Sequence, residues 1–108
     1  MKIMLDDMRE GLDCDIVIRN EVAFSVFLDL LNIDFKEPKF DLVIDHDLGE
    51  TSKSGYEALK TMFYDFRIFP ESVFIISSNP VGIRSIQGLL IEQDYYNINY
   101  DGRTFVKR

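Results

Sequence analysis

Short apolar runs recur along the chain, separated by stretches in which apolar residues return every three or four positions. Four of these runs predict β-strands, namely KIML (2–5), IVI (16–18), LVI (42–44) and SVFII (72–76). The first, third and fourth runs lack the alternation of a half-exposed strand, so we expect both faces of the sheet to be buried. YYNINY (95–100) predicts a fifth short strand, and the tail 101–108 is a candidate for a last one.

Three helices are predicted between these strands. Asn20 is a candidate N-cap for a stretch with apolar residues at helical spacing. Ser54 and Glu57 form a capping box before a second such stretch, and Asn79 with Pro80 begins a third. Strands that alternate with helices predict an α/β fold with a mostly parallel, five-stranded sheet. The length favours a single domain, residues 1–108.

Composition narrows the class of protein. Hydrophobic residues make up 46% of the chain, enough for a packed core, and the net charge of −7 disfavours non-specific binding to duplex DNA. The single cysteine, Cys14, excludes an internal disulfide and suits a reducing compartment. Acids from Asp6 onward exclude a signal-peptide core, and no apolar run is long enough to span a membrane. We therefore expect a cytoplasmic protein that does not bind membranes.

Polar clusters follow three of the predicted strands. They are Asp6 and Asp7 after the first, Asp45, His46 and Asp47 after the third, and Ser77, Ser78 and Asn79 after the fourth. Ligands of parallel α/β sheets bind outside the carboxyl ends of the strands, so the three clusters are expected to converge at one edge.

Carboxylates gathered at such an edge repel one another, and a divalent cation removes the repulsion. Mg²⁺ binds carboxylates and keeps positions open for phosphate oxygens, while the N-terminus of a helix attracts anions. The clusters thus predict a site for Mg²⁺ or Mn²⁺ and a phosphate. The candidate metal ligands are Asp6, Asp7, Asp45 and Asp47, and the candidate phosphate-binding residues are Ser77, Ser78 and Asn79.

The order of these motifs resembles the response-regulator receiver domain. In that family the acid pair and the third-strand Asp hold magnesium, and the third-strand Asp accepts a phosphoryl group; Asp45 and Asp47 both remain candidates for that position. The resemblance implies a receiver-like (flavodoxin-like) fold of three layers, or one trimmed to two. Only seven residues separate Asp6 from Cys14, and no last helix is apparent after Tyr100, so the first and last helices are expected to be reduced or missing. NINYDG also lacks the lysine that clamps the phosphoryl group, which argues against aspartyl phosphorylation.

A narrower subgroup is more similar. LDDMRE, IDHDLGE, the turn at Gly55 and SSNPVG resemble the compact cyclic-phosphate-processing receiver domains of bacteria and phages. The resemblance implies a metal-dependent phosphoesterase that acts on a phosphate-bearing small molecule or an RNA end. Arg9 is a candidate to clamp the phosphate, and His46 is a candidate general acid or base because its unperturbed pKa lies near neutrality. A solvated loop charge and a structural histidine are the alternatives.

A second interpretation belongs to another class of protein. A catalytically silent receiver-like module that binds a host protein would also lack the lysine and the two helices. In either case, strands that are apolar on both faces would leave one face bare where the helices are missing. An exposed apolar patch of that kind marks an interface, so we expect a homodimer.

Overall fold

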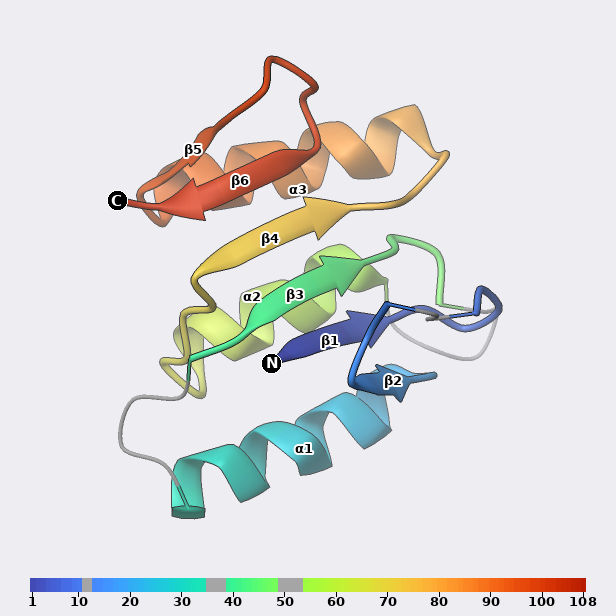
Figure 1. Ribbon diagram of the computed structural model, residues 1–108, viewed down its shortest axis with the longest axis vertical. Coiled ribbons are helices and arrows are strands. Elements are labelled where there is room, and N and C mark those ends of the chain that lie inside the picture. The colour runs from blue at the N-terminus through green and yellow to red at the C-terminus, as the bar shows by residue number, and fades with distance from the viewer. Residues whose placement is uncertain (11–12, 35–38, 49–53) are drawn as a thin grey trace.

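The computed structural model describes residues 1–10, 13–34, 39–48 and 54–108, which form one six-stranded sheet and three helices (Figure 1). The strands are β1 (Lys2–Leu5), β2 (Ile16–Ile18), β3 (Asp41–Ile44), β4 (Ser72–Ile75), β5 (Tyr95–Asn97) and β6 (Thr104–Lys107). The helices are α1 (Glu21–Asp34), α2 (Gly55–Tyr64) and α3 (Pro80–Glu92). All the strands and helices predicted from the hydrophobic pattern are therefore present.

The strands are arranged in the order β2-β1-β3-β4-β6-β5. β2, β1, β3 and β4 run parallel, whereas β6 pairs antiparallel with both β4 and β5. The predicted α/β fold with a mostly parallel sheet is confirmed. The predicted count of five strands is too low, because the tail folds back as β6 and lies between β4 and β5.

The helices begin at the caps that the sequence predicts. Asn20, Ser54 and Asn79 each accept a hydrogen bond from the backbone N–H three residues later, at 2.8, 3.2 and 3.1 Å. These bonds satisfy N–H groups that have no partner inside a helix. Two of the caps also place the starts of α2 and α3 close to the carboxyl ends of β3 and β4, where the polar clusters lie.

All three helices cover the same face of the sheet, in the order α1, α2, α3 (Figure 1). Ile3, Leu42 and Val73 point to that face and form one buried core with the apolar faces of the helices. Among the described residues, no helix lies between β1 and β2 or after α3. The receiver-like fold is therefore the trimmed form with two layers, and the expected loss of the first and last helices is confirmed.

The opposite face of the sheet is only partly exposed. Met4 and Val43 point to this face because alternate residues of a strand face opposite sides, yet they are only 4% and 5% exposed. They line a shallow cavity of about 290 Å³ together with Glu10 and Cys14 of the connection between β1 and β2. The connection thus occupies part of the place of the missing helix, and the apolar patch expected on this face is smaller than the sequence predicts.

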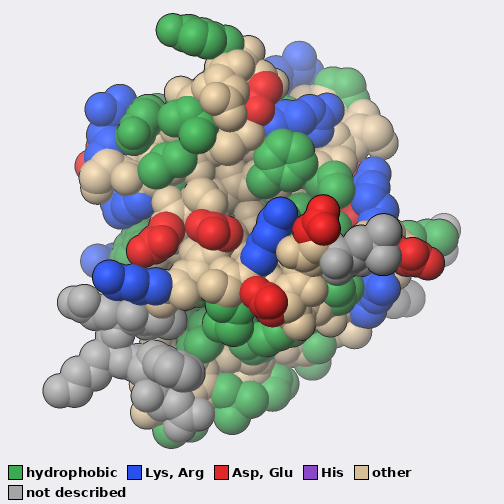
Figure 2. Space-filling view, viewed as in Figure 1, with side chains coloured by type: hydrophobic (Ala, Val, Ile, Leu, Met, Phe, Trp, Pro, Cys, Tyr) green, Lys and Arg blue, Asp and Glu red, His purple; other side chains and the backbone are tan. Residues whose placement is uncertain are grey.

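Exposed apolar side chains lie instead along the outer side of α1. Val22, Val26, Leu30 and Ile33 are 55–78% exposed, and Figure 2 shows hydrophobic side chains over this helix. Their spacing places them on one side of the helix, opposite the core residues Phe24, Leu28 and Leu31. α1 is therefore apolar on both its inner and its outer side. The homodimer stays a prediction.

Replacement of Gly55 by alanine should destabilise the domain. A Cβ atom at Gly55 would lie 1.9 Å from the backbone oxygen of Asp45, so either β3 or the start of α2 would have to move. Overpacking of this kind typically costs about 1–3 kcal/mol of the free energy of unfolding, which urea denaturation measures. Gly88 of α3 has open space around it, so Gly88→Ala should instead stabilise by about 0.5–1 kcal/mol. A Gly55→Ala variant as stable as the parent would contradict the close contact between α2 and the end of β3.

Candidate functional site

An open cavity of about 860 Å³ lies at the carboxyl ends of β1 and β3, close to where α2 begins. Its lining residues are Asp6, Asp7, Met8, Arg9, Asp45, His46, Asp47, Leu48, Ser54, Glu57 and Ser78. The polar clusters after β1, β3 and β4 all contribute to it, as the topology of a parallel sheet requires. Gly49, the last residue of the Asp-His-Asp-Leu-Gly motif, lies outside the described residues.

Three carboxylates converge at this edge. β1 and β3 pair with Leu5 beside Ile44, so the residues that follow, Asp6 and Asp45, must lie side by side. β1 ends before Asp6, which frees Asp7 from the alternation of a strand. One oxygen from each of Asp6, Asp7 and Asp45 lies within 4.8 Å of the others. These three residues are called the acid cluster below.

Asp6 is fully buried, and its carboxylate accepts three hydrogen bonds. Its Oδ1 accepts hydrogen bonds from the backbone N–H groups of Met8 and Arg9 at 2.9 and 3.0 Å, and its Oδ2 accepts one from Arg9 Nη1 at 2.8 Å. Burial raises the pKa of Asp6, but these hydrogen bonds and the charge of Arg9 outweigh burial and lower the pKa overall. The loop after β1 thus supplies the donors that favour the ionised form of Asp6.

Arg9 joins two members of the acid cluster. Its Nη1 lies 2.8 Å from Asp6 Oδ2 and 3.0 Å from Asp45 Oδ2, and its side chain is 39% exposed. The hydrogen bond to Asp6 raises the pKa of Arg9. Arg19 holds the same loop through its backbone, since Arg19 Nη1 donates to the carbonyl oxygens of Asp6 and Arg9 at 3.3 and 2.5 Å. The guanidinium that the sequence suggested for a phosphate thus contacts carboxylates in this structure.

The carboxylate of Asp47 is not part of the acid cluster, although the backbone N–H of Asp47 donates to Asp45 Oδ1 at 3.4 Å. Asp47 is exposed, and its Oδ1 accepts a hydrogen bond of 3.5 Å from Asn79 Nδ2. Of the two acids that the sequence left as alternatives, Asp45 is the one placed beside Asp6 and Asp7, and it is only 6% exposed. Asp47 instead links the end of β3 to the start of α3.

His46 packs against α3. A Cβ atom at Gly82 would lie 2.3 Å from His46 Cγ, so this glycine makes room for the imidazole ring. His46 Nδ1 is buried and has no hydrogen-bond partner among the described residues. The residue also lines the cavity. Its neighbours therefore hold the ring in place, and a role in proton transfer stays a prediction.

The three residues suggested for phosphate binding, Ser77, Ser78 and Asn79, do not all face the cavity. Ser77 is fully buried, and its hydroxyl accepts a hydrogen bond of 3.0 Å from the N–H of Asn79. Asn79 Oδ1 accepts from the N–H groups of Val81 and Gly82, both at 3.1 Å. The first amides of α3 are thus bound by their own cap and are not open to an anion. Ser78 is the one of the three suggested residues that lines the cavity.

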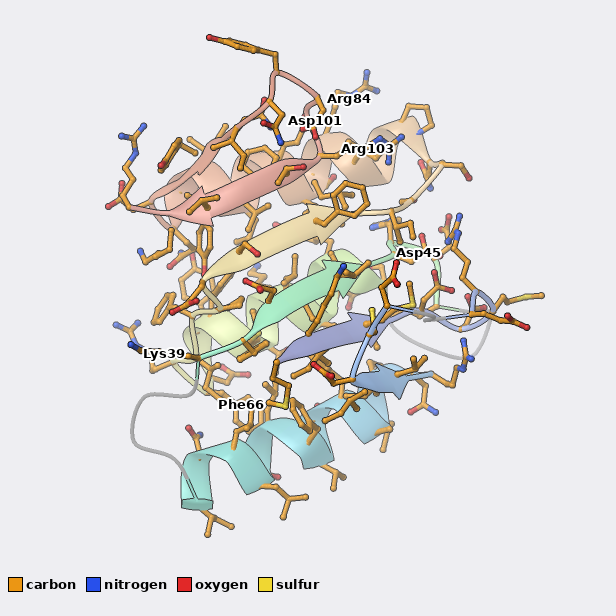
Figure 3. The ribbon with its side chains drawn as sticks, in the orientation of Figure 1. Lys39, Asp45, Phe66, Arg84, Asp101 and Arg103 are labelled. Atoms are coloured by element: carbon orange, nitrogen blue, oxygen red, sulfur yellow. The ribbon has the colours of Figure 1, made fainter. Side chains whose placement is uncertain are left out.

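Arg103 is a cation that the sequence analysis missed. It precedes β6, and its Nη1 donates to the backbone oxygens of Ile75 and Ser77 at 2.9 and 2.8 Å (Figure 3). Because β6 runs antiparallel to β4, its first residues lie at the carboxyl end of β4. Lys107 lies at the other end of β6 and donates to the backbone oxygen of Gln93 at 2.7 Å. The receiver pattern places a lysine after a parallel strand. Arg103 is an arginine that precedes an antiparallel strand, so that pattern does not indicate it.

Charge limits what the cavity can bind. Five carboxylates line it, those of Asp6, Asp7, Asp45, Asp47 and Glu57, and Arg9 is the arginine among the lining residues. A phosphate would be repelled by this excess of negative charge. Three converging carboxylate oxygens are the hard donors that Mg²⁺ and Mn²⁺ prefer, so the residues present fit such an ion.

A two-layer α/β domain with an acid cluster at the carboxyl ends of β1 and β3 is a receiver-like domain. The sequence profile of the cyclic-phosphate processing receiver domain matches residues 1–92 of the 108-residue chain. The chain therefore belongs to the cyclic-phosphate processing receiver domain family, and the resemblance deduced from its motifs is confirmed. No curated protein and no solved structure matches the chain. The matched region ends with α3, so the β5–β6 hairpin that carries Arg103 lies beyond it.

In the part of the chain that the structure describes, no helix has the length and apolar character needed to cross a membrane.

The turn that presents Arg103 should be sensitive to acid. Hydrogen bonds from the hydroxyl and N–H of Thr104 and from the N–H of Arg103 lower the pKa of Asp101. A carboxylate with a depressed folded-state pKa contributes stability above its unfolded pKa of about 3.9, and this stability is lost as the pH falls through the folded value. Urea denaturation of metal-free protein between pH 5 and pH 3 should therefore show a shallower loss of stability in Asp101→Asn than in the parent. Equal slopes would contradict the role of Asp101 in this turn.

Proposed function

We propose that this domain hydrolyses a cyclic or terminal phosphate of a nucleotide or RNA end, with Mg²⁺ or Mn²⁺ held by Asp6, Asp7 and Asp45. The observation that carries the proposal is the convergence of three carboxylate oxygens within 4.8 Å at the edge of an open cavity. Membership of a family named for cyclic-phosphate processing supports the class of substrate. The excess of acids in the cavity supports the need for a cation.

The size and charge of the cavity favour a small substrate. A volume of about 860 Å³ lies within the range of ligand pockets and accommodates a nucleotide. A net charge of −7 works against a long nucleic-acid backbone, which binds through many basic contacts. A nucleotide or a single RNA end is therefore preferred over a duplex.

The chemistry divides between the ion and the side chains that line the cavity. A bound divalent ion supplies positive charge to the phosphoryl group and an activated water. Arg9, partly exposed at the cavity, has guanidinium N–H groups that suit phosphate oxygens. Ser78 offers a hydroxyl as a further donor. When water adds to phosphorus and the ester bond breaks, the leaving oxygen takes a proton, and His46, the single histidine of the chain, lines the same cavity as its candidate donor.

A second candidate function is a receiver-like module that binds another protein without catalysis. The outer side of α1, with Val22, Val26, Leu30 and Ile33 exposed, favours this alternative because contiguous exposed apolar residues mark interaction surfaces. The capped amides of α3 also fit it, since they are not open to a phosphate. A host protein and a second copy of this chain are the partners that this alternative proposes.

Metal binding should depend on Asp45 and not on Asp47. At a free Mn²⁺ concentration 100 times the Kd, binding stabilises the folded state by about 2.7 kcal/mol. For a domain of this size that corresponds to a rise in Tm on the order of 10 °C. Chelator-treated parent protein and Asp47→Asn should show the rise in thermal denaturation, whereas Asp45→Asn should not. The absence of a rise in the parent, or an equal rise in Asp45→Asn, would contradict the metal site.

Hydrolysis should require the same residue. Protein loaded with Mg²⁺, which is diamagnetic and leaves phosphorus signals sharp, is incubated with a 2′,3′-cyclic nucleotide and, separately, with a nucleoside monophosphate, and ³¹P NMR follows the phosphorus signal. We expect one of the two signals to convert with the parent and with Asp47→Asn, and neither to convert with Asp45→Asn. Intact substrates in the presence of protein shown to bind Mg²⁺ would reject the enzyme and favour the binding module.

A further inference from the structure

The guanidinium of Arg9 occupies the position between Asp6 and Asp45. A single nitrogen, Nη1, lies 2.8 Å from one carboxylate and 3.0 Å from the other. A divalent ion shared by the same two oxygens would sit about 2.0–2.1 Å from each if it were Mg²⁺. Two cations cannot share that space, because they would approach each other closely and both carry positive charge. Arg9 and a metal ion therefore exclude each other at these oxygens.

The acids need this cation when no metal is bound. Asp6 is fully buried and Asp45 is 6% exposed, and neighbouring buried carboxylates are costly unless a positive charge compensates them. Asp6 Oδ1 has two backbone donors, but the donor to Asp6 Oδ2 and to Asp45 Oδ2 is the same Arg9 nitrogen. Among the described residues, Arg9 is thus the cation that pairs with Asp6 and Asp45 in the metal-free domain.

The side chain of Arg9 can leave without rearranging the loop. The backbone N–H of Arg9 donates to Asp6 Oδ1, and Arg19 holds the carbonyl oxygen of Arg9, so the main chain is anchored independently of the guanidinium. The side chain is 39% exposed and lines the open cavity. A phosphate entering that cavity offers the planar guanidinium a second anion with matching geometry.

We propose that Arg9 is a displaceable cation: it neutralises Asp6 and Asp45 in the free domain and transfers to the phosphate when a divalent ion takes its place. This inference rests on the proposed function, because it concerns the same acids. Since the guanidinium cannot be on both partners at once, a phosphate that attracts it makes room for the ion. Binding of phosphate and binding of the ion then strengthen each other, and the coupling is reciprocal.

The test is the Mn²⁺ affinity of the chelator-treated 108-residue chain, measured by isothermal titration calorimetry with and without inorganic phosphate. Without phosphate, Arg9→Gln should bind Mn²⁺ about tenfold or more tightly than the parent. A factor of this size is typical of coupling between two binding events. Phosphate should tighten Mn²⁺ binding in the parent and have little effect in Arg9→Gln. Arg9→Lys keeps the competing charge, so its Mn²⁺ affinity should stay close to that of the parent.

Arg19→Gln is the matched control. It removes the same charge from a neighbouring residue between β2 and α1, but Arg19 Nη1 contacts the backbone oxygens of Asp6 and Arg9 and not the carboxylates. Its Mn²⁺ affinity should rise less than that of Arg9→Gln. An equal rise would assign the effect to general charge and overturn the inference, as would an unchanged or weaker affinity in Arg9→Gln.

Failure of the inference is distinguishable from failure of the proposed function. Parent and Arg9→Gln that bind Mn²⁺ equally would overturn the displaceable cation and leave the metal site standing. If neither binds Mn²⁺, both proposals are rejected. If Arg9→Gln fails to fold without metal, the comparison is made with Arg9→Lys, which should bind Mn²⁺ as the parent does. A Mn²⁺ affinity of Arg9→Lys about tenfold above that of the parent would overturn the inference.

Discussion

The in-register pairing of β1 with β3 determines which side chains meet at the candidate site. With Leu5 beside Ile44, the chain must leave the sheet with Asp6 and Asp45 next to each other, and the rest of the domain buries both. Two adjacent buried carboxylates demand positive charge, and the short loop after β1 provides it through Arg9 only three residues after Asp6. The Asp-Asp-x-Arg motif is therefore an electrostatic unit. Asp6 brings negative charge into a buried position, and Arg9, three residues later in the same loop, compensates it.

Much of the fold could be predicted because local signals and topology agree. The caps at Asn20, Ser54 and Asn79 and the apolar runs mark the helices and the parallel strands, and the short connection after Asp6 leaves no room for a helix. The sixth strand is harder to predict because its pairing depends on a turn with positive φ at Asn99, Tyr100 and Gly102, two of which are not glycine. A sequence pattern does not show that the tail will insert beside β4.

The candidate site could be predicted at the level of elements but not of contacts. The carboxyl ends of parallel strands meet at one edge, which is why the acids after β1 and β3 converge. Which of Asp45 and Asp47 joins the acid cluster depends on where β3 ends and on the bond from Asn79 to Asp47. The ion pair of Arg9 with Asp45 and the packing of His46 against Gly82 join residues from different elements. No single sequence motif contains both partners of either contact.

The central claim is that the acid cluster is a divalent-cation site from which Arg9 can be displaced. The most direct measurement is a crystal structure of the domain soaked with Mn²⁺ and inorganic phosphate, with anomalous scattering used to locate the ion. The account predicts an anomalous peak bounded by Asp6, Asp7 and Asp45, with the Arg9 guanidinium moved from the carboxylates to the phosphate. A peak elsewhere in the cavity, or Arg9 still bound to Asp6 and Asp45 beside a bound ion, would contradict it.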